Sequence, residues 1–194
     1  FQDRWYCVFR EGDGHAKGAG VIRVLASEDG ARWQSVAVLA KDGVDLRDPH
    51  VCVAPDGRLV LNGGAAEPHT RDPLKDHYSF VSFSKDGKTW TALQRVIDSW
   101  HWLWRLTWHG DTAYGVAYFH GPKAGGAQGY RTALFRSKDG VQYEKVAELG
   151  QKFTSEATLR FDGDTLYCLQ RRDGYPGITA LLGTSKPPYT TWDW

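Results

Sequence analysis

Apolar residues in this chain fall in short runs that are separated by breaks rich in Gly, Pro and Asp. The runs at 21–25, 78–83 and 132–135 contain many β-branched or aromatic residues, and shorter runs follow each of them. Such runs, bounded by turn residues, predict β-strands. No segment sustains the period of an amphipathic helix. The pattern therefore predicts an all-β chain.

A repeated phrase separates the paired runs. It reads Ser-x-Asp-Gly-x-x-aromatic and begins at Ser27, Ser84 and Ser137, and a degraded fourth copy is expected at Ser185, where Lys-Pro-Pro replaces Asp-Gly. Asp-Gly is a hairpin signal, because Gly accepts a positive φ and the Asp side chain can bond its own backbone. The serines are 57, 53 and 48 residues apart. A strand-rich repeat of roughly 50 residues indicates a solenoid or a propeller.

Each phrase is expected to join the third and fourth strands of a four-stranded unit, since further hairpins at 54–57, 109–111 and 162–164 supply the first two strands. We therefore predict a β-propeller of four-stranded antiparallel blades, with a single propeller segment over residues 1–194. The blade units are expected at about 1–40, 46–98, 102–150 and 154–194, the first and last of them partial. Because propellers close with about 4 to 8 blades, the chain is expected to be a segment of a larger ring.

Composition limits the partners. The 194 residues carry a formal net charge of +1 with both signs interspersed, which argues against a nucleic acid as the main partner. No apolar stretch is long enough to span a membrane. Cys7, Cys52 and Cys168 lie in strand-like runs and are expected to be buried thiols rather than a disulfide or a metal site. No pair of His or Cys residues has convincing metal-ligand spacing, so neither metal nor cofactor is expected.

The repeated phrase resembles the Asp-box of the sialidase (neuraminidase) superfamily, with one residue fewer between Asp and Gly. Asp-boxes also occur in propellers that are not sialidases. The segment Leu46-Arg47-Asp48-Pro49 resembles the Arg-Ile-Pro segment of that family, in which the Arg binds the substrate carboxylate; the resemblance implies this role for Arg47. The family's acid/base Asp comes from a polar loop before the third strand. Here that loop offers Asp76 as the first choice and Asp72 as the second.

A second segment, 155–173, resembles the one that carries the family's Glu and, one hairpin later, a second substrate-binding Arg. The resemblance implies that Glu156 activates a nucleophilic Tyr, and strand alternation favours Arg171 over Arg172 as the Arg. No candidate for the Tyr or for a third Arg is evident in this chain. Asp48 departs from the family pattern, because it replaces an apolar residue. Arg47 and Glu156 are 109 residues apart, fewer than the family leads us to expect.

Charged residues are expected where the innermost strands of the units begin. They are Arg10 with Glu11, Arg47 with Asp48, Arg105, and Glu156. Arg suits bidentate binding of a carboxylate, and carboxylates can serve as general acid or base. The alternative is a ring of ion pairs that satisfies the strand ends.

Four tryptophans share one parity and are expected on one face of a strand, opposite Arg105. They are Trp100, Trp102, Trp104 and Trp108. Core packing is favoured for Trp104 and Trp108. Trp100 and Trp102 are expected in the preceding loop, where a ring can stack on a sugar, and Trp102 is a candidate for substrate binding.

The resemblance implies a retaining, sialidase-like glycoside hydrolase that acts on terminal acidic sugars and has six blades, with five as the alternative. Glu156 and Asp76 would be catalytic, and Arg47, Arg171 and Arg105 would bind the substrate. Arg47-Asp48-Pro49 also resembles the Arg-Asp-Pro motif of five-bladed furanosidase-type hydrolases, in which Asp48 and Glu156 would be the working carboxylates.

A non-catalytic propeller that binds carbohydrate or protein is the third alternative, because fold does not determine function. Both enzyme hypotheses, sialidase-like and furanosidase-type, imply a glycan or glycoconjugate as the partner. The oligomeric state stays undetermined. A secreted or periplasmic location fits the resemblance alone.

Overall fold

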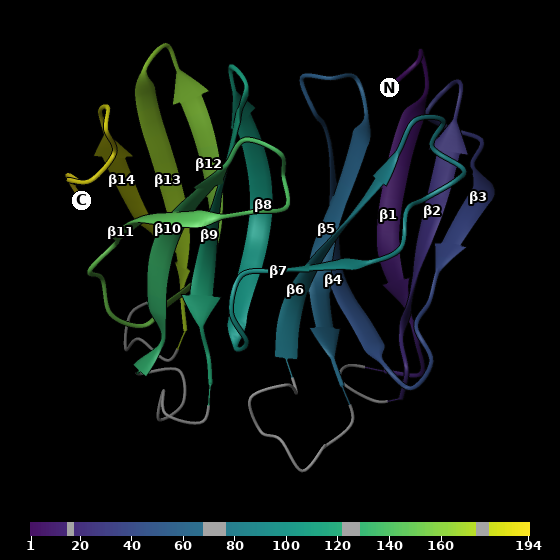
Figure 1. Ribbon diagram of the computed structural model, residues 1–194, viewed down its shortest axis with the longest axis horizontal. Helices are drawn as coiled ribbons and strands as arrows, with labels where there is room; N and C mark the ends of the chain where they lie inside the picture. The colour runs from purple at the N-terminus through teal and green to yellow at the C-terminus, as the bar shows by residue number, and fades with distance from the viewer. Residues whose placement is uncertain (15–17, 68–76, 122–128, 174–178) are drawn as a thin grey trace. The chain divides into compact units, whose positions relative to one another are not determined.

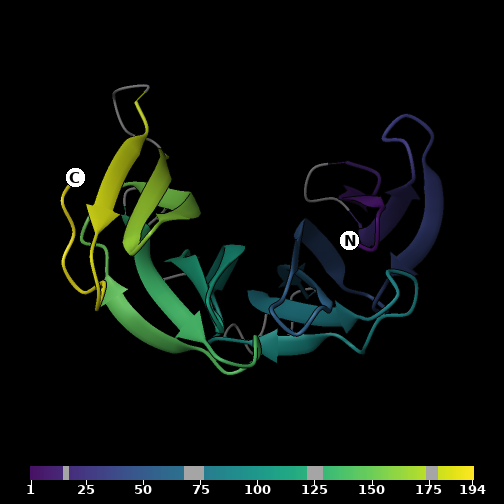
Figure 2. The same ribbon diagram turned by 90° about the horizontal axis from the view of Figure 1, so that it is seen from above.

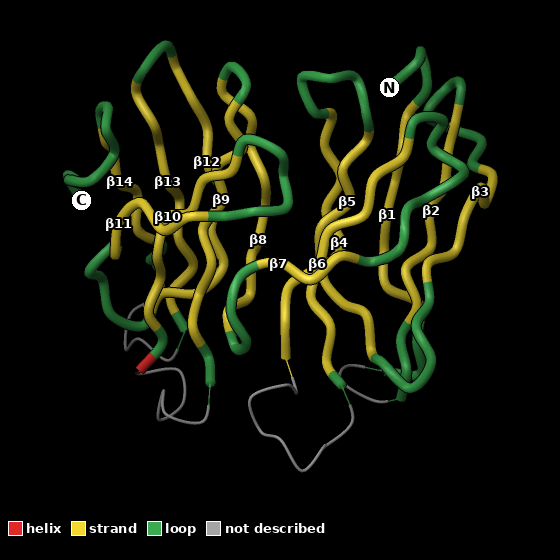
Figure 3. The backbone as a smooth tube through the Cα atoms, viewed as in Figure 1, coloured by secondary structure: helices red, strands yellow, loops and turns green. Residues whose placement is uncertain are grey.

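The computed structural model describes residues 1–14, 18–67, 77–121, 129–173 and 179–194. These residues are built from antiparallel β-strands joined by turns and loops (Figures 1 and 3). The first sheet contains β1 (Trp5–Glu11), β2 (Val21–Ser27) and β3 (Gln34–Leu39). The second sheet contains β4 (Asp45–Val53), β5 (Leu59–Ala66), β6 (His77–Ser84) and β7 (Gln94–Val96).

The third sheet contains β8 (His101–His109), β9 (Thr112–Phe119), β10 (Arg131–Ser137) and β11 (Glu144–Glu148). The fourth sheet contains β12 (Thr154–Asp162), β13 (Thr165–Arg172) and β14 (Leu181–Ser185). Strands within each sheet are hydrogen-bonded in chain order. The predicted all-β chain with four-stranded antiparallel sheets is therefore confirmed.

The chain divides into two compact units, residues 1–99 and 100–194. Unit 1 holds the first and second sheets and unit 2 holds the third and fourth, and Figure 2 shows the two sheets of each unit as separate layers. The core of each unit lies between its two sheets. In unit 1, Ile22 and Val24 of the first sheet pack with Leu46, Leu61 and Phe80 of the second. Burial of such side chains is the main favourable term in folding, so each pair of sheets stabilises itself.

The three repeated turns have one geometry. In the turn after β10, Gly140 N–H donates to Ser137 Oγ at 2.9 Å, and Ser137 Oγ donates to Asp139 Oδ1 at 2.9 Å. Asp139 Oδ1 also accepts from the backbone N–H of Val141 and of Gln142, both at 2.8 Å. The turns that begin at Ser27 and Ser84 repeat these bonds, and the Gly of every turn has a φ of 70–76°. The local sequence therefore determines the turn, since all its bonds lie within it.

Ser185 ends β14 as the other turn serines end their strands, but it closes a different turn. Its hydroxyl donates to the carbonyl oxygen of Thr191 at 2.6 Å. In the part of the chain that the structure describes, only an isolated bridge between Thr184 and Asp193 follows β14. The degraded copy therefore keeps the serine and loses the Asp-Gly geometry.

The turn serines show which strands of the different sheets correspond to one another. Each serine pairs with the second strand of its unit: Ser27 with Trp5, Ser84 with Leu59, Ser137 with Ala113, and Ser185 with Leu166. Strand β1 thus corresponds to β5, β9 and β13, and not to the first strands β4, β8 and β12. The expectation that Arg10 and Glu11 begin an innermost strand is wrong, because they end a second strand.

The three cysteines form no disulfide, and they differ in burial. Cys168 is completely buried, whereas Cys7 is exposed on β1, so the expectation of a buried thiol is wrong there. Among the described residues, no helix has the length and apolar character needed to cross a membrane.

Candidate functional site

A β-bulge interrupts the first strand of the second, third and fourth sheets. In β4, Asp48 and Pro49 face the single residue Gly63 of β5. In β8, two residues stand between Leu103 and Leu106, namely Trp104 and Arg105. In β12, Ser155 and Glu156 face Arg171 of β13. Bulges are over-represented next to active sites, where they redirect side chains. Each bulge contains at least one charged residue that the sequence marks as a candidate.

The bulge in β4 presents Asp48 to solvent. Asp48 has a φ of 48°, a left-handed conformation that is uncommon for residues other than Gly. The backbone here passes close to β5, because a Cβ on Gly63 would lie 2.7 Å from the carbonyl oxygen of Arg47. Gly63 therefore gives the bulge the space that it needs, and Asp48 is held in a strained, exposed position.

Arg47 is anchored by a carboxylate that the sequence does not single out, Asp45. Arg47 Nε donates to Asp45 Oδ2 at 2.6 Å, and Arg10 Nε donates to Asp45 Oδ1 at 2.8 Å. The backbone N–H of Gly20 donates to Asp45 Oδ1 at 2.9 Å. The side chains of Arg10, Asp45 and Arg47 retain 17%, 8% and 21% of their exposure. One buried carboxylate thus holds two guanidinium groups from adjacent sheets.

Burial by itself would raise the pKa of Asp45. The hydrogen bonds from Arg10 and Arg47 and the Arg47 charge outweigh it, so the pKa of Asp45 lies below its ordinary value. Gly20 provides the space for this cluster, since a Cβ there would lie 2.4 Å from both Arg10 Nε and Asp45 Oδ1. Glu11 lies apart from the cluster and is paired with Arg23 near the surface.

Glu156 and Arg171 are brought together across the bulge in β12. Arg171 Nη1 donates to Glu156 Oε1 at 2.8 Å, and Arg171 Nη2 lies 2.9 Å from Asp173 Oδ1. Asp173 also accepts from Ser155 Oγ, and its backbone N–H donates to the carbonyl of Phe153 at 2.6 Å. The ion pair with Glu156 raises the pKa of Arg171. Arg171 is the more exposed partner, with 58% of its side chain accessible against 29% for Glu156.

A surface pocket of about 360 Å³ lies beside this pair in unit 2. Its lining includes Glu156 and Arg171 together with Trp104, Thr158 and Thr179. A carboxylate, a guanidinium, hydroxyl groups and an indole are the groups with which proteins hold sugars and their acidic substituents. The pocket therefore has the chemistry of a polar-ligand site.

Arg105 projects into solvent from the bulge in β8, and it has no ion-pair partner among the residues that the structure describes. The expected common face of the tryptophans is wrong. Trp102 pairs with Tyr118 and Trp108 with Ala113, so the bulge between them places these two rings on opposite faces. Trp102 lies within β8, is 4% exposed and packs edge-on against His120. Little of its ring is accessible to a ligand.

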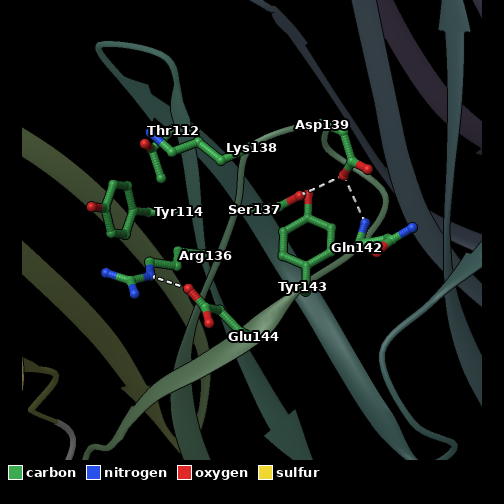
Figure 4. Close-up of a pocket in the computed structure, with 9 residues that line it drawn as sticks. All are labelled: Thr112, Tyr114, Arg136, Ser137, Lys138, Asp139, Gln142, Tyr143 and Glu144. Atoms are coloured by element: carbon green, nitrogen blue, oxygen red, sulfur yellow. Dashed lines mark hydrogen bonds and ion pairs between the residues drawn. The ribbon is translucent and has the colours of Figure 1, made fainter.

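A pocket of about 690 Å³ lies at the third turn rather than at a bulge (Figure 4). Figure 4 shows that Asp139 accepts hydrogen bonds from the Ser137 hydroxyl and from the backbone N–H of Gln142, and that Arg136 is paired with Glu144. These polar groups are thus already bonded to one another within the turn and its two strands. We interpret this pocket as structural and the three bulges as candidate functional positions.

Asp76 and Asp72 lie outside the described residues, so their roles stay predictions. The sequence reasoning missed Asp45 and Asp173. Asp45 stands two residues before Arg47, and this same-face spacing on a strand is the signal that could have identified it. Among the described residues, no group of three or more His, Cys, Asp or Glu side chains could hold a metal ion.

No family model matches the sequence, and no curated protein matches it. Solved structures do match. A protein of unknown function from Dyadobacter fermentans aligns with 99% of this chain and 65% of its own, at 15% identity and a TM-score of 0.81. The Hadza microbial sialidase Hz136 aligns with 98% of this chain and 43% of its own, at 15% identity and a TM-score of 0.76.

A GH32 β-fructofuranosidase from Bombyx mori, BmSUC1, aligns with 96% of this chain and 44% of its own, at 15% identity and a TM-score of 0.66. The chain thus spans between two fifths and two thirds of the length of these proteins. At this identity the likeness concerns the fold. The four-stranded antiparallel sheets and these matches together identify the chain as part of a β-propeller.

Proposed function

We propose that this chain belongs to a glycoside hydrolase and that the bulges in its first strands β4, β8 and β12 carry functional residues. The observation that carries the proposal is that each bulge contains a candidate residue, namely Asp48, Arg105 or Glu156. Propeller blades surround a central channel, and the first strand of each blade lies nearest to it. Bulges in these strands turn charged side chains toward a ligand.

The leading substrate class is a glycan with an acidic terminal sugar, cleaved as a sialidase does. Arg47 and Arg171 would bind the sugar carboxylate, because a guanidinium matches a carboxylate with two parallel hydrogen bonds. Arg105, with no partner among the described residues, would add positive charge. Asp45 holds Arg47 by its Nε, which leaves the terminal nitrogens for a ligand. The structural match to a sialidase supports this substrate class.

The proposed chemistry is retaining. Glu156, held by Arg171, is a carboxylate that can accept a proton from a hydroxyl and so activate a Tyr nucleophile. Asp76 would be the acid/base that protonates the leaving oxygen. A Tyr nucleophile is a recognised exception to the pair of carboxylates that most glycosidases use.

A furanosidase-type hydrolase is the second candidate, and the conformation of Asp48 favours it. A non-Gly residue at a φ of 48°, exposed at a bulge, carries strain that is typical of functional positions. Asp48 and Glu156 would then be the two working carboxylates. The structural match to a β-fructofuranosidase supports this alternative.

One assay separates the candidates. The protein is incubated with a panel of fluorogenic sialosides and a panel of fluorogenic furanosides, beside Glu156→Gln, Asp48→Asn and the control Glu148→Gln. Glu148 is exposed on β11 and paired with Lys145, so its substitution should leave turnover unchanged. Sialoside turnover that falls about 100-fold or more in Glu156→Gln supports the leading candidate.

Furanoside turnover that falls as steeply in both Asp48→Asn and Glu156→Gln supports the second candidate. If neither panel is turned over, both enzymatic proposals fail. If Glu156→Gln behaves like the Glu148→Gln control, the role given to Glu156 is wrong.

A further inference from the structure

Asp173 lies directly after β13, and its side chain links the bulge in β12 to the strand opposite. Its Oδ1 lies 2.9 Å from Arg171 Nη2, and its Oδ2 accepts a hydrogen bond from Ser155 Oγ. Its backbone N–H donates to the carbonyl of Phe153 at 2.6 Å. Arg171 Nη1 in turn donates to Glu156 Oε1 at 2.8 Å. Because Ser155 and Glu156 are the two bulged residues, these contacts close a ring around the bulge, within unit 2.

The position of the Glu156 carboxylate depends on this ring. Among the described residues, Arg171 is the only hydrogen-bonding or ion-pairing partner of the Glu156 side chain. Asp173, by contrast, is held by Ser155 and by its own backbone bond, as well as by Arg171. Ser155 is 2% exposed, and 21% of the Asp173 side chain is accessible. Asp173 is therefore the better anchored end of the ring, and the orientation of Glu156 depends on it through Arg171.

The bulge itself does not require the ring. The residue opposite the bulge is Gly63 in the second sheet and Val116 in the third, where Arg171 stands in the fourth. Neither Gly63 nor Val116 has a side chain that can pair with a carboxylate. The bulges in β4 and β8 therefore form without an ion pair across them, so the fold alone does not account for the ring in the fourth sheet.

We propose that Asp173 is a positioning residue, which holds the Arg171 guanidinium so that Arg171 fixes the Glu156 carboxylate for proton transfer. The inference rests on the proposed function, in which Glu156 accepts a proton from a hydroxyl. A general base must lie within hydrogen-bond reach of the proton that it takes, so its orientation affects the rate. The Nε of Arg171 has no partner among the described residues, so the ring leaves this donor for a ligand.

Arginine ¹⁵N NMR tests the contact without any substrate. A guanidinium held by two carboxylates rotates slowly, and its two terminal nitrogens then give separate signals. We expect separate Arg171 signals, assigned with Arg171→Lys, in the wild type and in the control Asp162→Asn, and one averaged signal in Asp173→Asn and Ser155→Ala. Asp162 is exposed at the far end of β12, which makes it a matched substitution in the same hairpin. Averaged Arg171 signals in the wild type overturn the proposal.

Steady-state kinetics test the positioning role, with the fluorogenic glycoside that the wild type turns over. In Asp173→Asn we expect kcat to fall about 10- to 100-fold, because a catalytic group misplaced by about 1 Å costs this much, while KM changes less than about twofold. Asp162→Asn should have wild-type kinetics. Circular dichroism spectra matching that of the wild type establish that the variants are folded. An unchanged kcat in folded Asp173→Asn overturns the proposal.

The double variant Asp173→Asn with Glu156→Gln separates positioning from a structural role. If Asp173 acts through Glu156, its substitution should cause no further loss of kcat once Glu156 is replaced. Losses that multiply in the double variant overturn the positioning role, since Asp173 then acts independently of Glu156. If the wild type turns over neither panel of glycosides, the proposed function fails and the catalytic use of Asp173 fails with it, whereas averaged Arg171 signals reject the positioning alone.

Discussion

Asp45 and Arg47 stand two residues apart on β4, and Arg47 Nε donates to Asp45 Oδ2 at 2.6 Å while Arg10 holds the other oxygen. The carboxylate is therefore saturated by groups that all lie within unit 1. These bonds hold the Arg47 side chain in place on β4, and they link the first sheet to the second. Its energetic role can be measured independently of any activity.

Removal of the Asp45 charge should destabilise unit 1. In Asp45→Asn, two largely buried guanidinium groups lose their common acceptor, and we expect a loss of about 2–3 kcal/mol in the free energy of unfolding. Urea denaturation measures this. The control is Asp56→Asn, which breaks the exposed pair with Arg58 and should cost less than about 1 kcal/mol. Equal losses in the two variants would contradict the role assigned to burial.

The contribution of Asp45 to the free energy of unfolding should depend on pH. Its pKa in the folded protein lies below the ordinary value of 3.8, so the folded state binds the proton less readily than the unfolded chain. The stabilisation is therefore fully present above that value and is lost as the pH falls through the folded-state pKa. Urea midpoints of the wild type and Asp45→Asn should differ at pH 7 and converge toward pH 3. A difference between the two urea midpoints that grows as the pH falls would contradict this prediction, because the folded state would then bind the proton more readily than the unfolded chain.

Gly20 should tolerate no side chain while the cluster is intact. The Cβ of Gly20→Ala would lie 2.4 Å from two atoms of the ion pair, and overpacking of this kind costs about 1–3 kcal/mol. The double variant Gly20→Ala with Asp45→Ala should lose less than the sum of the single variants, because the clash with Asp45 is gone. Strictly additive losses would show that Gly20 acts through its backbone alone.

The turn serines should affect stability and not binding. In Ser137→Ala the N–H of Gly140 loses its acceptor and Asp139 loses a donor, which we expect to cost about 1–2 kcal/mol. Ser84→Ala should cost a similar amount, because its turn has the same bonds. Thermal unfolding measures both. Loss of glycan binding or turnover in Ser137→Ala without a change in stability would instead make the pocket of Figure 4 a functional site.

The two equivalent cysteines should differ in reactivity. Burial raises the pKa of the Cys168 thiol from 9.0 to about 12, so its thiolate fraction at neutral pH falls roughly a thousandfold. Cys7 is exposed. Labelling with iodoacetamide followed by peptide mass spectrometry should modify Cys7 in the native protein and Cys168 only after unfolding. Native labelling of Cys168 at a rate close to that of Cys7 would contradict the burial of this strand.

Local patterns in the sequence were sufficient for the strands, the turns and the order of the sheets. The bonds of the Ser-x-Asp-Gly turn join residues at most three positions apart, so the phrase contains everything that the turn requires. Alternation also favoured Arg171 over Arg172 as a substrate-binding Arg, and that choice stays a prediction. The turn bonds are short in sequence, and residue type alone predicts them.

The tertiary structure decided the rest. Arg10 and Asp45 are 35 positions apart and meet only because two sheets pack together. The bulge in β8 reverses the parity that the sequence predicts for the tryptophans, because an inserted residue depends on the partner strand. Cys7 and Cys168 differ only in whether another sheet covers them. The sequence by itself thus determined the repeating blades, whose bonds are local, and packing between sheets determined which charged side chains are anchored and which are exposed.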